Sequence, residues 1–156
     1  MISIDVPGFH ALRLEHLVMD YNGTLAVDGR LLPGVAEVLK DLASRIHIHV
    51  ITADTFGLVK QQLSGLPVAV TITPAENQAE AKLGFITELG GTSVVAIGNG
   101  RNDRKMLHAA ALGIVVIQKE GSAAETLASA DVVCLDILDA LELLINHRRL
   151  VATLRC

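Results

Sequence analysis

The stretch Val94-Val95-Ala96-Ile97-Gly98-Asn99-Gly100-Arg101-Asn102-Asp103 joins a short apolar run to a polar, glycine-rich loop. Short apolar, β-branched runs bounded by glycine are typical of strands that are buried on both faces, as in a parallel sheet. Ile114-Val115-Val116-Ile117 repeats the apolar pattern about one helix-length later. The two runs predict parallel strands connected by a helical crossover.

Outward from this stretch, apolar runs alternate with segments of helical period along the chain. The predicted strands are Leu14–Met19, Ile46–Ile51, Val68–Thr73, Val94–Ile97, Ile114–Gln118 and Val132–Leu135. The predicted helices are Val35–Ser44, Thr55–Ser64, Ala75–Leu89, Asn102–Ala111, Ala123–Ser129 and Asp136–Arg149. This alternation predicts an α/β fold, a three-layer, Rossmann-like, doubly wound parallel sheet with helices on both faces. No repeat or linker interrupts it, and we expect residues 1–156 to form one domain.

The composition excludes several classes of protein. Apolar residues make up 51% of the 156 residues and charged residues 19%, which is unlike a disordered chain. A net charge of −4, no Trp and one Tyr argue against a nucleic-acid partner. No apolar run reaches the roughly 18 residues of a membrane helix, no targeting segment is recognisable, and two cysteines make no disulfide framework. We therefore expect a cytoplasmic protein with no membrane partner.

Polar residues cluster just after the predicted strands, where chemistry collects in folds of this class. Asp20 ends an apolar run, Thr52 follows the next strand, and Asp103 lies in the glycine-rich loop. Lys82 lies in the first half of a predicted helix, from which its ammonium can reach back to the same crevice. Together they offer a nucleophile, a hydroxyl, a cation and a second carboxylate, the set that phosphoryl transfer through an aspartyl-phosphate needs.

Two further features bear on this interpretation. Gly23 lets the chain turn sharply after Asp20 and present backbone N–H groups to an anion. Two carboxylates with backbone oxygens and water also suit Mg²⁺, which prefers octahedral oxygen ligands. Taken alone, Asp20 and Asn22-Gly23 are equally compatible with an ordinary capped turn.

Four segments in order resemble the motifs of the haloacid dehalogenase (HAD) superfamily. Asp20-Tyr21-Asn22-Gly23-Thr24 is similar to the first motif, Thr52 to the second, Lys82 to the third, and Gly98-Asn99-Gly100-Arg101-Asn102-Asp103 to the fourth. The resemblance covers about Leu14 to Leu144 and is closest to the phosphorylation domain of P-type ATPases. Only about thirty residues separate Asp20 from Thr52, so the interval has no room for the nucleotide-binding domain of an ion pump.

The resemblance implies a Mg²⁺-dependent phosphohydrolase in which Asp20 attacks phosphorus. Thr52, Lys82 and Gly23 would hold the phosphoryl group. Asp20, the backbone carbonyl of Asn22, Asn99 and Asp103 would bind Mg²⁺. The substrate would be a phosphorylated compound whose identity the sequence does not give.

Two amides depart from the family pattern. Asn22 stands where the family has an acid/base Asp, and general acid–base catalysis is worth roughly 10²- to 10⁴-fold. We therefore expect slow turnover, a long-lived aspartyl-phosphate, or a substrate with a good leaving group. Asn99 replaces a second Asp and removes one negative charge from the metal site. The alternative is a catalytically weak or inactive phosphate-binding or regulatory protein on the same fold.

Other features concern the surroundings of this site. The intervals Ala26–Leu32 and Pro74–Ala81, where relatives carry a cap domain, hold seven and eight residues and are too short for one. We expect an open crevice and, from the high apolar fraction, a homo-oligomer. Tyr21 is expected to face the crevice. His47 and His49 share one face of a strand, where they either hydrogen-bond beneath a helix or at a subunit contact, or bind a transition metal.

Overall fold

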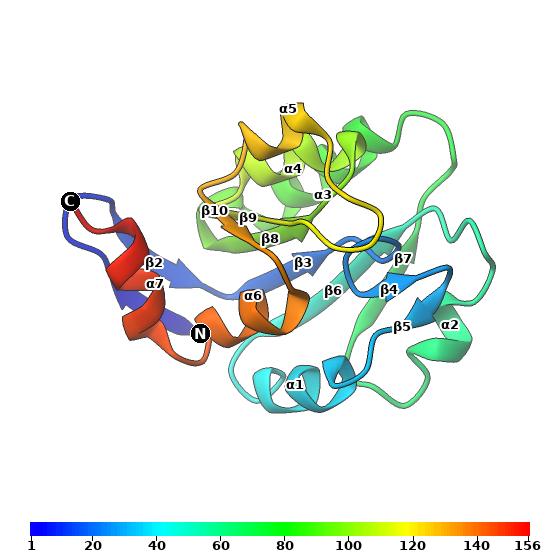
Figure 1. Ribbon diagram of the computed structural model, residues 1–156, viewed down its shortest axis with the longest axis horizontal. Helices are drawn as coiled ribbons and strands as arrows, with labels where there is room; N and C mark the ends of the chain where they lie inside the picture. The colour runs from blue at the N-terminus through cyan, green and yellow to red at the C-terminus, as the bar shows by residue number, and fades with distance from the viewer.

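The computed structural model describes all residues from 1 to 156, and a six-stranded parallel sheet forms its centre (Figure 1). The strand order is β10 (Val132–Cys134), β9 (Leu112–Val116), β8 (Val94–Gly98), β3 (His16–Met19), β6 (His47–Thr52) and β7 (Ala69–Ile72). Every neighbouring pair is parallel. The chain runs from β3 to β6 on one side and later returns to β8 on the other. The predicted doubly wound sheet is therefore confirmed, with its switch point at β3.

Helices cover both faces of the sheet, because successive residues of its strands point to opposite sides. Val18 of β3 and Ile51 of β6 pack with residues of α3 (Gln78–Leu89) and α4 (Arg104–Ala109). Leu17 and Met19 join the larger apolar cluster on the other face, with residues of α1 (Val35–Leu42) and α6 (Ile137–Leu143). The short α5 (Ala124–Leu127) lies beside α4 (Figure 1).

An antiparallel hairpin before the sheet was not predicted. It consists of β1 (Ile2–Asp5) and β2 (Ala11–Leu14), and it packs against the C-terminal helix α7 (His147–Leu154). The predicted strand Leu14–Met19 was wrong at its start, because Glu15 separates β2 from β3. Buried and exposed residues alternate along both hairpin strands, which is the period of a half-buried ribbon.

A second, two-residue hairpin occupies the interval after the first motif. Its strands are β4 (Ala26–Val27) and β5 (Arg30–Leu31), and Asp28 and Gly29 between them have φ values of 51° and 76°. Two successive left-handed residues make the primed turn that fits the twist of a hairpin. This hairpin fills the interval, and the fold has no cap domain, as predicted.

Tyr21 does not face the crevice, contrary to expectation. Its side chain is fully buried in the larger core, and its hydroxyl donates to the backbone carbonyl of Gly29 at 2.9 Å. Tyr21 therefore fastens the β4–β5 hairpin to the loop that carries Asp20. Burial, together with the charge of Asp54, raises the pKa of Tyr21 to about 12.

Several predicted helices are shorter than expected. The helix predicted at Thr55–Ser64 is only α2 (Val59–Gln62), since Asp54 and Gly57 are left-handed at φ 52° and 67°. The helix predicted at Asp136–Arg149 is two helices, α6 and α7, because the chain leaves helical geometry at Asn146. Short 3₁₀ turns, η1 (Gly91–Ser93) and η2 (Arg101–Asp103), precede β8 and α4. No helix is both long and apolar enough to cross a membrane.

Candidate active site

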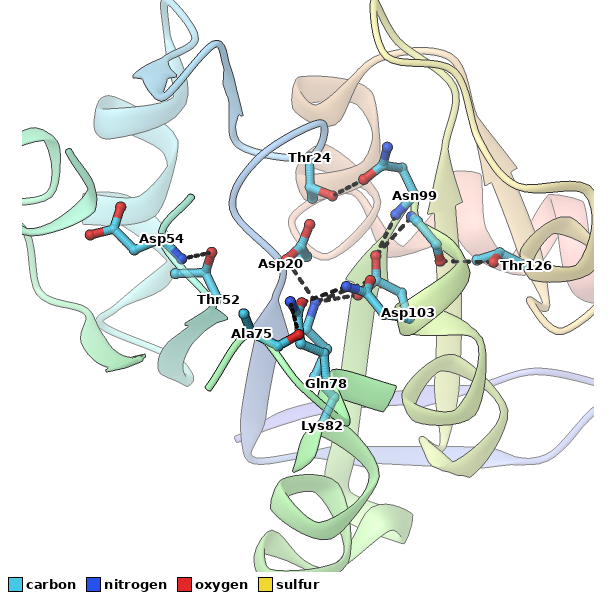
Figure 2. A network of polar contacts seen from close by, with 12 residues as sticks. Asp20, Thr24, Thr52, Asp54, Ala75, Gln78, Lys82, Asn99, Asp103 and Thr126 are labelled. Atoms are coloured by element: carbon cyan, nitrogen blue, oxygen red, sulfur yellow. Dashed lines mark hydrogen bonds and ion pairs between the residues drawn. The ribbon is translucent and has the colours of Figure 1, made fainter. Parts of the chain in front are cut away.

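A buried triad of one cation and two carboxylates lies at the carboxyl end of the central strands. Lys82 Nζ donates to Asp20 Oδ1 at 2.7 Å and to Asp103 Oδ1 at 2.6 Å. The Lys82 and Asp103 side chains are completely buried, and that of Asp20 is 12% exposed. Figure 2 shows Lys82 reaching from α3 to both carboxylates. Three residues distant in sequence therefore form one charged unit with a net charge of −1 when all three are ionised.

Asp103 is held in place by the glycine-rich loop after β8. Its Oδ2 accepts hydrogen bonds from the backbone N–H groups of Asn99 at 3.0 Å and Gly100 at 2.8 Å. A Cβ on Gly98 would lie 2.6 Å from Asp103 Cγ. Glycine is therefore required at position 98, because any larger residue would displace the carboxylate or the strand.

A small pocket of about 170 Å³ opens above the triad. Asp20, Asn22, Thr52 and Asn99 line it, while Lys82 and Asp103 lie behind its wall. The Asn22 Oδ1 atom is buried without a hydrogen-bond partner. A buried polar atom with no partner is costly, so this oxygen marks a position where the pocket can receive a donor or a cation.

The hydrogen bonds of the pocket walls orient two predicted site residues. Thr24 Oγ1 donates to Asn99 Oδ1 at 3.3 Å, and Asn99 Nδ2 donates to the Gly121 carbonyl at 3.0 Å. Thr52 Oγ1 accepts from the Asp54 N–H at 3.0 Å. That bond leaves the Thr52 hydroxyl proton free to donate to an anion. In Figure 2, Thr52 lies on the opposite side of Asp20 from Asp103.

The surroundings of Asp20 raise its pKa above that of an ordinary aspartate. Burial and the charge of Asp103 raise the pKa of Asp20 to about 7, although Lys82 opposes both effects. Burial lowers the pKa of Lys82, but the attraction of Asp20 and Asp103 outweighs it and the net pKa is raised. Lys82 therefore stays charged, and the Asp20 carboxyl takes up a proton more readily than an ordinary aspartate does.

Gly23 lies outside this pocket, and its predicted role in phosphate binding needs correction. Its N–H donates to the Ala26 carbonyl at 2.7 Å and is not free for an anion. A Cβ there would meet Glu120 Oε2 at 2.3 Å and Asn99 Nδ2 at 2.4 Å, and its φ is +81°. Glycine is needed at position 23 for close packing and for a left-handed turn.

Gln78, Asn102 and Glu120 also line the pocket and are not among the predicted catalytic, phosphate-binding or metal-binding residues. Asn102 Nδ2 donates to Gln78 Oε1 at 2.6 Å, which links the fourth-motif loop to the start of α3. Glu120 lies at the rim, and burial and the charge of Asp28 raise its pKa. In the sequence, the only indication of their role was their position just after a strand or at the start of a helix. The fold then brings them to one pocket.

The oxygen atoms around the pocket match the preferences of Mg²⁺. Asp20 and, behind the pocket wall, Asp103 supply carboxylates, and Asn22 and Asn99 supply amide or carbonyl oxygens. No group of three or more His, Cys, Asp and Glu side chains in the chain is arranged to hold a metal ion. A metal here would therefore depend on the amide and backbone oxygens as well as the two carboxylates. Asn22 has an unpartnered side-chain oxygen, Oδ1, besides the backbone carbonyl that is expected to bind the metal.

At the opposite end of the same strands, His47 and His49 are joined by His16, which was not predicted. His16 Nδ1 and His49 Nε2 are 3.1 Å apart and share a hydrogen bond. The His49 ring meets Phe85 of α3 edge-on, with centroids 5.5 Å apart. Burial is the main cause that lowers the pKa of His16 and of His49, and neighbouring histidines add to it. The rings therefore form a neutral, hydrogen-bonded pair beneath a helix.

No family model matches the chain. Among solved structures, a protein assigned to the HAD superfamily (subfamily III A) hydrolases, from Legionella pneumophila, superposes with a TM-score of 0.72 at 18% identity, over 90% of this chain and 87% of that chain. The chain has the HAD fold.

Another chain with this fold is similar in length to the protein. The 3-deoxy-D-manno-octulosonate 8-phosphate phosphatase from Moraxella catarrhalis, in complex with magnesium, phosphate and KDO, has a TM-score of 0.66 and 22% identity. The match covers 90% of this chain and 93% of that one. The HAD fold is therefore matched over nearly the full length of both proteins.

The P-type ATPase likeness is real but partial. A zinc-transporting PIB-type ATPase matches 78% of this chain and only 20% of its own, with a TM-score of 0.63 and 22% identity. In sequence, the chain is 48% identical over 79 residues to the uncharacterized protein MJ0073 of Methanocaldococcus jannaschii. That match spans 48% of this chain and 85% of the archaeal protein, and the chain belongs to the same family.

Proposed function

We propose that the protein is a Mg²⁺-dependent phosphohydrolase that works through an aspartyl-phosphate on Asp20. The observation that carries this proposal is the position of Asp20, which lines the pocket and is bound from behind by Lys82 at 2.7 Å. A carboxylate that is fixed from one side and open on the other is suited to act as a nucleophile. The HAD fold of the neighbouring phosphatases adds support.

In the first step, an oxygen of the Asp20 carboxylate attacks phosphorus, the ester P–O bond breaks, and the leaving group takes a proton from water. In the second step, water attacks the same phosphorus, the bond to Asp20 breaks, and the proton that this water loses neutralises the hydroxide left by the first step. The products are inorganic phosphate and the free carboxylate. Lys82 stays protonated and offsets the charge of the two buried carboxylates throughout.

The remaining pocket residues position the phosphoryl group. The Thr52 hydroxyl donates to a phosphoryl oxygen, since its own acceptor site is already occupied by the Asp54 N–H. Asp20, Asp103, Asn99 and the Asn22 backbone carbonyl would hold Mg²⁺. When bound, Mg²⁺ supplies positive charge that offsets the repulsion between carboxylate and phosphate. Because Asn22 replaces the family carboxylate, no residue at that position donates a proton to the leaving group.

Asn22 also favours a second candidate, a phosphate-binding or regulatory protein that does not turn over. An amide neither donates a proton as a carboxylic acid does nor accepts one from water at neutral pH. The intact Asp20–Lys82–Asp103 triad favours the enzyme, because phosphate binding alone gives no reason to bury two carboxylates around one lysine.

The deciding experiment measures hydrolysis of 4-nitrophenyl phosphate and acetyl phosphate with and without Mg²⁺. Both leaving groups are good and need little help from an acid. We expect Mg²⁺-dependent turnover by the wild type, none by Asp20→Asn, and a phosphoryl group on the Asp20 peptide in mass spectra of quenched reactions. An inert wild type that still binds phosphate would favour the second candidate.

A further inference from the structure

We call the small pocket lined by Asp20, Asn22, Thr52 and Asn99 the phosphate pocket, after its proposed ligand. A larger pocket adjoins it and is not used by the chemistry described above. It has a volume of about 520 Å³, and we call it the annex pocket, defined by Val27, Pro33, Gln118, Glu120, Leu135 and Leu138. Glu120 also lines the phosphate pocket, and Gly23 of the annex pocket follows Asn22 of the phosphate pocket in sequence. The two pockets therefore meet beside the point where a phosphate ester would project from Asp20.

The annex pocket is built from three segments that one side chain holds together. Gln118 Nε2 donates to the carbonyls of Gly23 at 3.2 Å and Thr24 at 2.8 Å. Its Oε1 accepts from the N–H of Ile137, at the start of α6, at 2.9 Å. A single amide thus joins the Asp20 loop, the loop after β9 and α6. Such a cavity is largely formed before a ligand arrives, which is typical of small-molecule sites.

The lining indicates what the annex pocket would accept. Most of its walls are aliphatic, from the β4–β5 hairpin and from Leu135 and Leu138 around the start of α6. Its charged residues are two acids, Glu120 and Asp136, and one base, Lys119. A second phosphate or carboxylate would meet more negative than positive charge there. The volume falls within the roughly 300–1,000 Å³ of small-molecule pockets.

We propose that the annex pocket binds the leaving group of a phosphate monoester, and that this group is apolar and has no second anionic group. This inference rests on the proposed function, since it takes the phosphate to lie at Asp20. It separates the chain from its Moraxella neighbour, which is named for an octulosonate, a sugar acid.

The test compares three substrates that share the phosphate and differ in the rest. Acetyl phosphate is too small to fill the annex pocket, 2-naphthyl phosphate fills it with apolar surface, and 3-phosphoglycerate brings a carboxylate. Because the leaving groups also differ in reactivity, each variant is compared with the wild type on the same substrate. Filling the pocket with Val27→Trp is expected to lower kcat/KM for 2-naphthyl phosphate about tenfold or more and to leave acetyl phosphate unaffected.

Leu135 offers a charge test on an exposed side chain, with a matched control two residues away. Leu135 is 73% exposed and lines the annex pocket, whereas Val133 is 51% exposed and does not line it. Leu135→Lys is expected to raise kcat/KM for 3-phosphoglycerate and Leu135→Glu to lower it. Val133→Lys and Val133→Glu should change neither. Equal effects on kcat/KM at positions 135 and 133, or no loss of kcat/KM for 2-naphthyl phosphate with Val27→Trp, would overturn the inference. Turnover of acetyl phosphate would still support the proposed function.

A binding measurement keeps the two proposals separate if no substrate is turned over. Calorimetry with 1-naphthylmethylphosphonate, which cannot be hydrolysed at phosphorus, reports occupancy of both pockets. If Val27→Trp weakens binding of the phosphonate and leaves binding of inorganic phosphate unchanged, the annex pocket is supported. Only the proposed enzymatic activity is then overturned. Equal affinity of the wild type for both ligands would overturn the annex pocket.

Discussion

The two ends of strands β3 and β6 carry polar clusters that differ in charge, burial and surroundings. At the carboxyl end, Asp20 belongs to a buried triad with Lys82 and Asp103 beside an open pocket. At the amino end, His16 and His49 share a hydrogen bond beneath α3. The same two strands thus position a charged triad beside a pocket at one end and a neutral histidine pair at the other.

The difference shows what a site needs besides polar residues. Backbone N–H groups from the loop after β8 converge on Asp103, and the glycine at position 98 leaves room for it. The histidines, in contrast, are held by one another and by Phe85. Burial of charge is tolerated only where opposite charge and hydrogen bonds offset the loss of water. The triad at the carboxyl end meets this condition. The histidines at the amino end do not need to meet it, because their rings stay neutral.

Removing the cation of the triad should have the largest effect. Lys82→Met leaves Asp20 and Asp103 buried without a partner, and we expect a loss of about 3–5 kcal/mol in the free energy of unfolding, with no remaining turnover. Urea unfolding measures the first and acetyl phosphate hydrolysis the second. The control is Lys105→Met, whose partner Glu80 is exposed, and which should cost less than about 1 kcal/mol. Equal losses for the two variants would show that the triad is no different from a surface pair.

Restoring the family carboxylate should change the rate at the same end. Asn22→Asp places an acid/base group in the phosphate pocket, and we expect roughly 10²- to 10⁴-fold faster hydrolysis of an alkyl phosphate. Acetyl phosphate should gain far less, because its leaving group needs no proton. Steady-state kinetics on both substrates measure the two gains. A variant that accelerates both equally would place the benefit in metal binding instead of proton transfer.

The close packing of Asp103 predicts an intermediate effect on stability. In Gly98→Ala the new Cβ would lie 2.6 Å from Asp103 Cγ, and overpacking of this kind costs typically about 1–3 kcal/mol. Gly84→Ala is the matched control, because a Cβ there meets nothing within 4 Å and the position lies inside α3. It should stabilise the protein by up to about 1 kcal/mol. Thermal unfolding that shifted the same way in both variants would contradict the packing argument.

The smallest effects concern pH, and they should have opposite signs at the two ends. The pKa of Asp20 is raised to about 7, so the folded state binds more protons than the unfolded state, and Asp20 contributes stability that is lost as pH rises from about 4 to 7. The pKa values of His16 and His49 are lowered. Their contribution is therefore present above about pH 6.5 and is lost as pH falls below it.

Urea unfolding at a series of pH values separates these contributions. Compared with the wild type, Asp20→Asn should lose less stability as pH rises, and His49→Phe should lose less as pH falls. His49→Phe should also leave acetyl phosphate turnover unchanged, since the ring lies at the far end of the strand. Parallel pH profiles for wild type and both variants would remove the contrast between the two ends.

Sequence reasoning succeeded where a local pattern carries the information and failed where distant segments meet. The six parallel strands were predicted because each is a short apolar run bounded by glycine or polar residues. The β1–β2 hairpin was missed, although Ile2, Ile4, Leu12 and Leu14 alternate with exposed residues, because each strand is only four residues long. Tyr21 was misplaced because its neighbours in sequence are site residues, whereas its hydroxyl binds Gly29 across the hairpin.

The sequence by itself determined the class of fold and the chemical types at the strand ends, since periodicity and residue identity are local properties. Only the tertiary structure decided which of these groups meet. It placed Lys82 behind Asp20, turned the Gly23 N–H away from the pocket, and brought Gln118 between the Asp20 loop and α6. The physical reason is that a hydrogen bond or ion pair between distant residues depends on how the helices and loops pack on the sheet.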